Sequence, residues 1–207
     1  MSSPIAPPPV VEAPSLGPET VRGIERALGP SAGRNAPPWV PLLVLGALEA
    51  SAGLLGAPIT RRAKSRAWYR SLVKAPGTPP DRVFGLVWPA LYATAAIAGA
   101  RVWRSPGSLS RTRALVLWGT QLATNAAWTP LFFGARRPRL ALVDLALLGT
   151  SVGGFALAAR KIDRTAAWLS LPYLAWVGFA GYMNGFIVAK NRRRPLRPYF
   201  ARRSIAT

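Results

Sequence analysis

Apolar residues gather in five long, almost uncharged runs that are separated by short segments rich in arginine. The runs cover residues 39–59, 83–100, 114–135, 140–159 and 165–189. At about 1.5 Å of rise per residue, a helix of about 20 residues spans the roughly 30 Å hydrocarbon layer of a bilayer. The pattern therefore predicts an all-α fold, a bundle of five transmembrane helices at about residues 39–60, 80–103, 112–134, 138–160 and 165–190.

The segments on either side of these runs have a different composition. Residues 1–38 are rich in Pro, Ala and Ser and have no charged start followed by an apolar core, so no cleavable signal is predicted. We expect three parts: a disordered Pro-rich N-terminal extension at 1–38, a membrane domain at 39–191 and a basic C-terminal tail at 192–207.

The charge distribution indicates topology rather than nucleic-acid binding. The 207-residue chain has a net charge of +20, but all its Lys and Arg lie outside the five apolar runs. A nucleic-acid partner is therefore not expected, because such a protein carries its basic residues on the exposed face of a folded element. The 61–82 and 134–139 connectors and the C-terminal tail share the more basic side of a five-helix bundle. The positive-inside rule places that side in the cytoplasm.

The absence of Cys and His removes several chemistries together. Disulfides, thiol nucleophiles, imidazole catalysis and the commonest zinc and haem-iron ligands are excluded, and no metal site is predicted. Glu49 and Asp144 are the only acids within the runs, so ion- or proton-coupled transport is one hypothesis. The alternative for Asp144 is structural, near the start of its helix and paired with Arg139.

Aromatic and amide residues recur at helical spacing on three of the predicted helices. The stripes are Trp88, Tyr92, Ala95 and Gly99; Gln121, Asn125, Trp128 and Phe132; and Tyr173, Trp176, Ala180 and Asn184. In lipid an amide is best hidden inside the bundle, where such faces would line a cavity for a flat, conjugated and mostly apolar molecule. The alternative is that amides and small residues join helices while the aromatics lie at the membrane interface. Spacing alone leaves both open.

Three ordered sequence blocks carry a family resemblance over about residues 42–191. They are WYRSLVK at 68–74 with PPDRVFGLVWPALY at 79–92, QLATNAAWTPLFFG at 121–134 with ALVD at 141–144, and PYLAWVGFA at 172–180 followed by Asn184. The chain resembles the TspO/MBR family, that is, the tryptophan-rich sensory proteins and translocator proteins. The resemblance implies a five-helix membrane bundle, often a homodimer, that binds porphyrins such as protoporphyrin IX and haem.

The resemblance also implies a ligand-binding site. Family pocket positions match Tyr69, Trp88, Tyr92, Asn125, Trp176, Ala180 and Asn184, and the aromatic stripe adds Trp128. The connector from Arg61 to Arg82 resembles the segment that covers the family's pocket, and Gly77 would permit a tight turn in it. Without His, Cys or a convenient Met, iron would be poorly coordinated. We therefore expect a metal-free porphyrin to bind at least as well as haem, and no cofactor to be required.

The function that follows is transport or sensing of a tetrapyrrole, with membrane lipid and a second copy of the chain as further partners. One alternative is light-dependent porphyrin breakdown, in which Trp88 and Trp176 would be the catalytic residues. Another is translocation of a sterol or other lipid, although the family's sterol motif is not cleanly present. The composition and the sequence blocks favour a bacterial cell membrane, with the mitochondrial outer membrane as the alternative.

Overall fold

The computed structural model describes residues 37–64 and 67–191, and all the regular secondary structure in this part of the chain is helical, as predicted. The predictions for the N-terminal extension and the C-terminal tail fall almost wholly outside the described residues. The elements are α2 (Trp39–Lys64), α3 (Ala67–Ser71), α4 (Asp81–Trp103), α5 (Leu109–Thr129), the π-helix η1 (Pro130–Gly134), α6 (Pro138–Ala159) and α7 (Arg164–Lys190).

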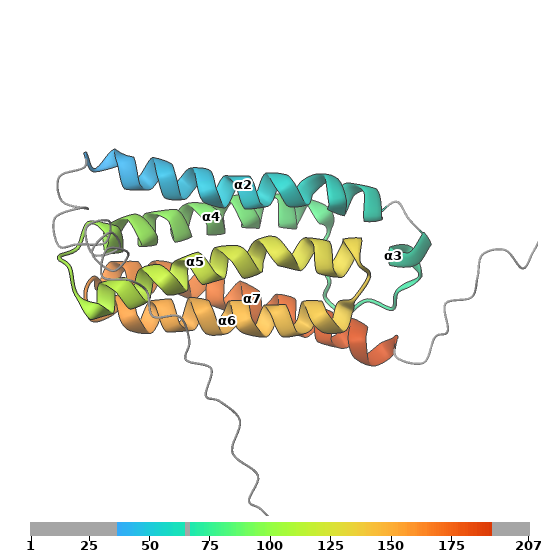
Figure 1. Cartoon of the computed structure of the whole chain (residues 1–207). Coiled ribbons are helices and arrows are strands. Elements are labelled where there is room, and N and C mark those ends of the chain that lie inside the picture. The colour runs from blue at the N-terminus through green and yellow to red at the C-terminus, as the bar shows by residue number, and fades with distance from the viewer. Residues whose placement is uncertain (1–36, 65–66, 192–207) are drawn as a thin grey trace, which may run out of the picture.

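The five long helices form a closed ring whose order differs from their order in the sequence (Figure 1). Helix α2 packs on α4, α4 on α7, α7 on α6, α6 on α5, and α5 again on α2. Consecutive helices run in opposite directions. One end of the bundle, here called the connector end, holds α3, the start of α4, η1 and the end of α7. The opposite end holds the short loops 104–108 and 160–163.

Four helices are long and apolar enough to cross a membrane, namely α2 as far as Arg62, α4, α6 and α7. The chain is therefore a multi-pass membrane protein. Helix α5 does not reach the same hydropathy, because polar side chains such as Thr120, Gln121, Thr124 and Asn125 recur along it.

The end of α5 departs from the predicted continuous helix at 112–134. The helix begins earlier, at Leu109, where the Ser108 side chain caps it by accepting a hydrogen bond from the Arg111 N–H at 3.1 Å. It changes to π geometry at Pro130, which has no N–H to continue the α pattern, and the Ala135 N–H reaches the Pro130 carbonyl at 2.8 Å. Arg136 then takes a left-handed conformation, with φ of 55°, and turns the chain into α6.

The half of the bundle toward the opposite end is tightly packed. Leu45, Trp118 and Phe155 meet there among small residues of α4, α5 and α6. The Trp118 indole N–H donates to the Ala95 carbonyl at 2.9 Å. This close approach depends on Gly99, since a Cβ atom there would lie 2.7 Å from the Trp118 Nε1 and 2.9 Å from a Leu45 methyl group.

Replacing Gly99 with Ala should therefore destabilise the bundle by about 1–3 kcal/mol, because the added methyl group overpacks the contact with Trp118. The measurement is thermal unfolding in detergent. Gly178→Ala is the matched control, since a Cβ atom there has no neighbour within 4 Å, and it should be neutral or slightly stabilising. Equal stability of the two variants would contradict this account of the packing.

Candidate functional site

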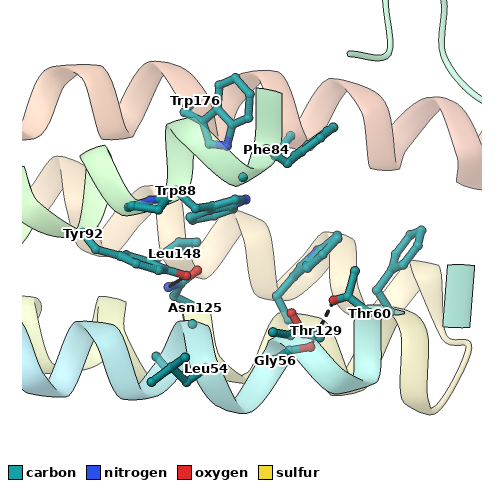
Figure 2. A pocket seen from close by; sticks show the side chains of 18 of the residues that line it. Leu54, Gly56, Thr60, Phe84, Trp88, Tyr92, Asn125, Thr129, Leu148 and Trp176 are labelled. Atoms are coloured by element: carbon teal, nitrogen blue, oxygen red, sulfur yellow. Dashed lines mark hydrogen bonds between the residues drawn. The ribbon is translucent and has the colours of Figure 1, made fainter. Parts of the chain in front are cut away.

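The half of the bundle toward the connector end contains a cavity of about 1130 Å³ (Figure 2). This volume lies slightly above the roughly 300–1,000 Å³ of typical small-molecule sites. Its wall is mainly apolar and aromatic and includes residues of all five long helices, of η1 and of the connector. The helices therefore leave a partly open space, with exposed Leu54 of α2 at its rim, that is large enough for a sizeable organic ligand.

All eight predicted binding residues line this one cavity: Tyr69, Trp88, Tyr92, Asn125, Trp128, Trp176, Ala180 and Asn184. They come from α3, α4, α5 and α7. The convergence that helical spacing left open is therefore present in the structure. Ligand binding by these residues remains a prediction.

Trp88 and Tyr92 form one aromatic wall on α4. Their ring centroids lie 5.5 Å apart, and the Trp88 ring also meets Tyr173 edge-on at 6.3 Å. The Asn125 amide N–H donates to the Tyr92 hydroxyl at 3.2 Å, so it holds this ring from α5. Gly53 of α2 makes the arrangement possible, because a Cβ atom there would lie 2.8 Å from the Tyr92 ring.

Two further aromatic groups complete the wall, and they include Phe84 and Phe133, for which the sequence predicted no role. Phe84 packs edge-on against Trp176 at 5.7 Å (Figure 2). Trp128 stacks on Phe132, with centroids 4.9 Å apart and planes 15° apart, and Phe133 packs against both rings. Phe132 was recognised only as part of a stripe. The π-helix is what brings two consecutive phenylalanines to this position, and no simple periodicity predicts it.

Asn184 lines the cavity, but its amide also holds two helices together. With the amide oriented to satisfy both partners, its nitrogen donates to the Pro138 carbonyl and its oxygen accepts from the Leu142 N–H, each at 3.1 Å. Both partners lie in the first turns of α6. Asn184 therefore contributes more to the contact between α6 and α7 than the predicted ligand-binding role suggested.

The connector carries the predicted turn and the remaining site residue. Gly77 has a φ of 77°, and the Thr78 N–H donates to the Ala75 carbonyl at 3.2 Å, which confirms the tight turn. Tyr69 packs edge-on against Phe133 at 5.3 Å. Burial, together with the nearby Asp81 carboxylate, raises the pKa of the Tyr69 hydroxyl above its usual value. This hydroxyl therefore stays protonated at neutral pH and available as a donor.

The two acids of the apolar runs do not line the cavity. Glu49 is fully buried, and its Oε1 accepts a hydrogen bond from the Gln121 amide at 2.6 Å, which joins α2 to α5. Asp144 is also buried, and within the described residues it makes no ion pair, so the predicted pair with Arg139 is wrong. Arg139 is exposed instead, close to the start of α6. Neither carboxylate therefore lies where it could contact a ligand in the cavity.

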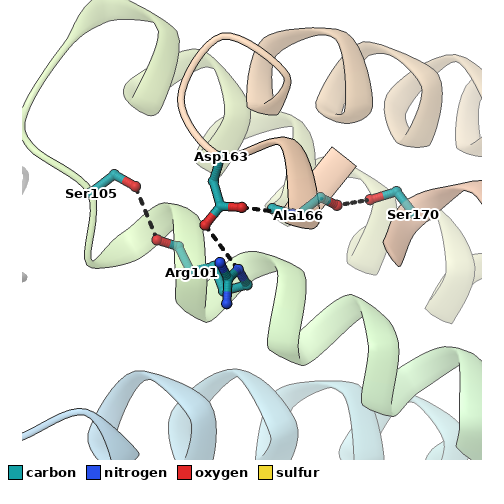
Figure 3. Close-up of polar contacts among 5 residues, drawn as sticks. All are labelled: Arg101, Ser105, Asp163, Ala166 and Ser170. Atoms are coloured by element: carbon teal, nitrogen blue, oxygen red, sulfur yellow. Dashed lines mark hydrogen bonds and ion pairs between the residues drawn. The ribbon is translucent and has the colours of Figure 1, made fainter. Parts of the chain in front are cut away.

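The opposite end of the bundle is closed by polar contacts (Figure 3). Arg101 near the end of α4 forms an ion pair with Asp163 at 2.8 Å, and the other oxygen of Asp163 caps α7 by accepting from the Ala166 N–H at 3.0 Å. The Arg111 guanidinium donates twice to the Trp103 carbonyl, at 3.1 and 2.8 Å. Most of the cavity lining therefore lies toward the other end, beneath the connector, and Leu42 and Gly46 in the first turns of α2 extend it toward this end.

The chain belongs to the TspO/MBR family, whose model matches residues 43–189. The resemblance seen in the sequence blocks is therefore confirmed. The chain is 42% identical over 151 residues to the Translocator protein of Bos taurus, covering 72% of this chain and 89% of that protein. It is 37% identical over 142 residues to the Tryptophan-rich sensory protein of Cereibacter sphaeroides, covering 68% and 88%. It is 34% identical over 140 residues to the Tryptophan-rich protein TspO of Chlorobaculum tepidum, covering 67% and 88%.

Replacing Asn184 with Leu should lower the stability of the bundle by about 1–3 kcal/mol, because it removes both hydrogen bonds to α6. Unfolding in detergent measures the loss. Asn125→Leu is the comparison. It removes one hydrogen bond, from the side-chain amide to the Tyr92 hydroxyl in the cavity, and should lower the stability by less than Asn184→Leu does. If Asn184→Leu were as stable as the wild type, the structural role of this amide would be wrong.

Proposed function

We propose that this protein binds a planar tetrapyrrole, such as protoporphyrin IX, in the cavity and acts in its transport or its sensing. The observation that carries the proposal is the convergence of Trp88, Trp128 and Trp176, together with the Asn125–Tyr92 pair, on one large apolar space. Flat conjugated rings are well matched to indole and phenol faces, and a few amides fix their orientation. The names of the family relatives, which describe translocation and sensing, agree with either role.

Unpaired polar atoms give further support. Within the described residues, the indole N–H groups of Trp128 and Trp176 are buried without an acceptor. Leaving a buried donor unpaired costs about 1–3 kcal/mol, so a ligand acceptor that satisfied either group after a small side-chain shift would stabilise the complex. The Tyr69 hydroxyl supplies a further donor at the edge of the cavity.

We further propose that α5 crosses the membrane as the fifth span. Helices α4 and α6 run in the same direction, so α5 has to return the chain across the same thickness between them. It lies between α2 and α6 in the ring, where Gln121 and Asn125 are buried, and the Thr120 and Thr124 hydroxyls donate to the Val116 and Thr120 carbonyls of their own helix. We expect the connector end to face the cytoplasm, because its connectors are the more basic ones. We expect a bacterial cell membrane and a homodimer.

Met183 modifies one expectation about the ligand. It is the only methionine in the chain besides Met1. Because it lies in the cavity wall, the site does contain one thioether, which the sequence did not predict. A lone thioether is a weak ligand for haem iron in the absence of His or Cys. Metal-free porphyrin should still bind at least as well as haem, and Met183→Leu should leave the ratio of the two affinities unchanged. Spectroscopic titration of both pigments measures this.

The central test is a titration of protoporphyrin IX into the full chain in detergent, with binding followed by visible absorption. The double variant Trp88→Phe/Trp176→Phe should bind about tenfold or more weakly, because each indole contributes stacking area that a phenyl ring replaces only in part. Trp168, which lies on the exposed face of α7, gives the matched control Trp168→Phe, with no expected loss. Equal affinity of the double variant and the wild type would refute the pocket assignment.

A second candidate function is light- and oxygen-dependent porphyrin breakdown. The observation that favours it is that Trp88 and Trp176 line the same cavity, where an indole could donate an electron to the excited ring of a bound pigment. Product analysis of illuminated and dark samples separates this activity from binding alone. Translocation of a sterol or other lipid is a third possibility, since the apolar wall would also accept such a molecule.

A further inference from the structure

Positive charge is confined to one end of the cavity. Among the described residues of its lining, the only cationic side chains are Arg61 in the last turns of α2 and Lys74 in the connector. Asp81 at the start of α4 is the one carboxylate there, so two cations face one anion at this end. The deeper wall, around Trp88 and Leu148, carries no charge.

Lys74 is held in position by the residues beside it. The Val73 N–H donates to the Asn191 side-chain oxygen at 3.1 Å, and the Asn191 amide donates back to the Val73 carbonyl at 3.2 Å. On the other side, Ala75 is buried, and the Tyr182 hydroxyl donates to the Pro76 carbonyl at 3.4 Å. The connector is therefore attached to the end of α7 on both sides of Lys74.

The Lys74 side chain follows the same edge of the cavity. Its ammonium lies 4.7 Å from the centroid of the Tyr69 ring, and both residues belong to the cavity lining. A cation placed against an aromatic face keeps its remaining N–H donors available to an anion. Arg61 approaches the same end from α2.

We propose that Arg61 and Lys74 form a carboxylate-recognition subsite, which orients an amphipathic anionic ligand with its acidic edge under the connector and its apolar edge among the indoles. The proposal rests on the proposed function and names its substrate class: tetrapyrroles that carry free carboxylates on one edge, in preference to their neutral esters. A carboxylate is costly in the uncharged interior, whereas at the connector end it gains charge-assisted hydrogen bonds. The two cations thus determine the orientation in which the pigment binds.

The experiment compares protoporphyrin IX with its dimethyl ester, a matched pair that differs only in the charge on that edge. Both are titrated into the full chain in neutral detergent, with binding followed by tryptophan quenching and visible absorption. The variants are Lys74→Gln, Arg61→Gln and the double variant. Lys161→Gln, in the loop at the opposite end of the bundle, is the matched control for removing one positive charge.

The wild type should bind the diacid more tightly than the ester. Each single variant should lose about three- to tenfold in affinity for the diacid, as expected for a partly exposed charge-assisted contact, and keep its affinity for the ester. The double variant should bind the two pigments alike. Lys74→Arg should retain the preference for the diacid, and added salt should reduce it in the wild type.

The outcomes separate this proposal from the function on which it rests. If both pigments bind and depend on Trp88 and Trp176, but no charge variant changes their ratio, the subsite is wrong and the tetrapyrrole site stands. If Lys74→Gln weakens both pigments equally, Lys74 shapes the connector and does not recognise the carboxylate. If the wild type binds neither pigment, both proposals fail.

Discussion

The structure depends on the need of polar groups to find partners inside the protein, because the hydrocarbon of a bilayer offers none. Helices satisfy the backbone, and side chains then make the contacts between helices. The Glu49–Gln121 bond joins α2 to α5, the Trp118 indole joins α5 to α4, and the Asn184 amide joins α7 to α6. Each of these contacts fixes the rotation of a helix about its axis. The faces that carry Trp88, Asn125 and Trp176 are thereby turned toward a common interior.

Much of the fold could be predicted from the sequence, because length and hydropathy report directly on helices in lipid. The predicted helices at 80–103, 138–160 and 165–190 lie within one residue of α4, α6 and α7 at each end. The end of the first helix was less predictable. Arg61 and Arg62 interrupt the hydropathy, yet α2 continues to Lys64 because a helix can extend beyond the hydrocarbon layer. The π-helix after Thr129 was also missed, since a proline predicts a break without specifying the geometry that replaces the α-helix.

The candidate site could be predicted in part. Aromatic residues and amides at helical spacing, together with the family blocks, pointed to eight residues that share one cavity. The contribution of α2 was missed, because Gly53 and Gly56 have no side chain that would mark them as site residues. They contribute by letting the Tyr92 and Thr129 side chains pack closely against the α2 backbone. Lys74 belonged to a recognised block without an assigned role. Its placement requires the contact between Val73 and Asn191, residues separated by more than a hundred positions, and such pairing has no local signal.

The separation between a tightly packed part of the bundle and a part that holds most of a partly open cavity has a consequence for how such a protein can diversify. Residues that secure assembly, such as Gly99 and Trp118, differ from those that line the cavity, such as Trp88 and Lys74. Substitutions at cavity-lining positions that join no helices, unlike Asn184, can therefore accumulate without weakening the packing of the bundle. The same fold can in this way bind chemically different ligands in different proteins, with substitutions confined to a few cavity-lining positions.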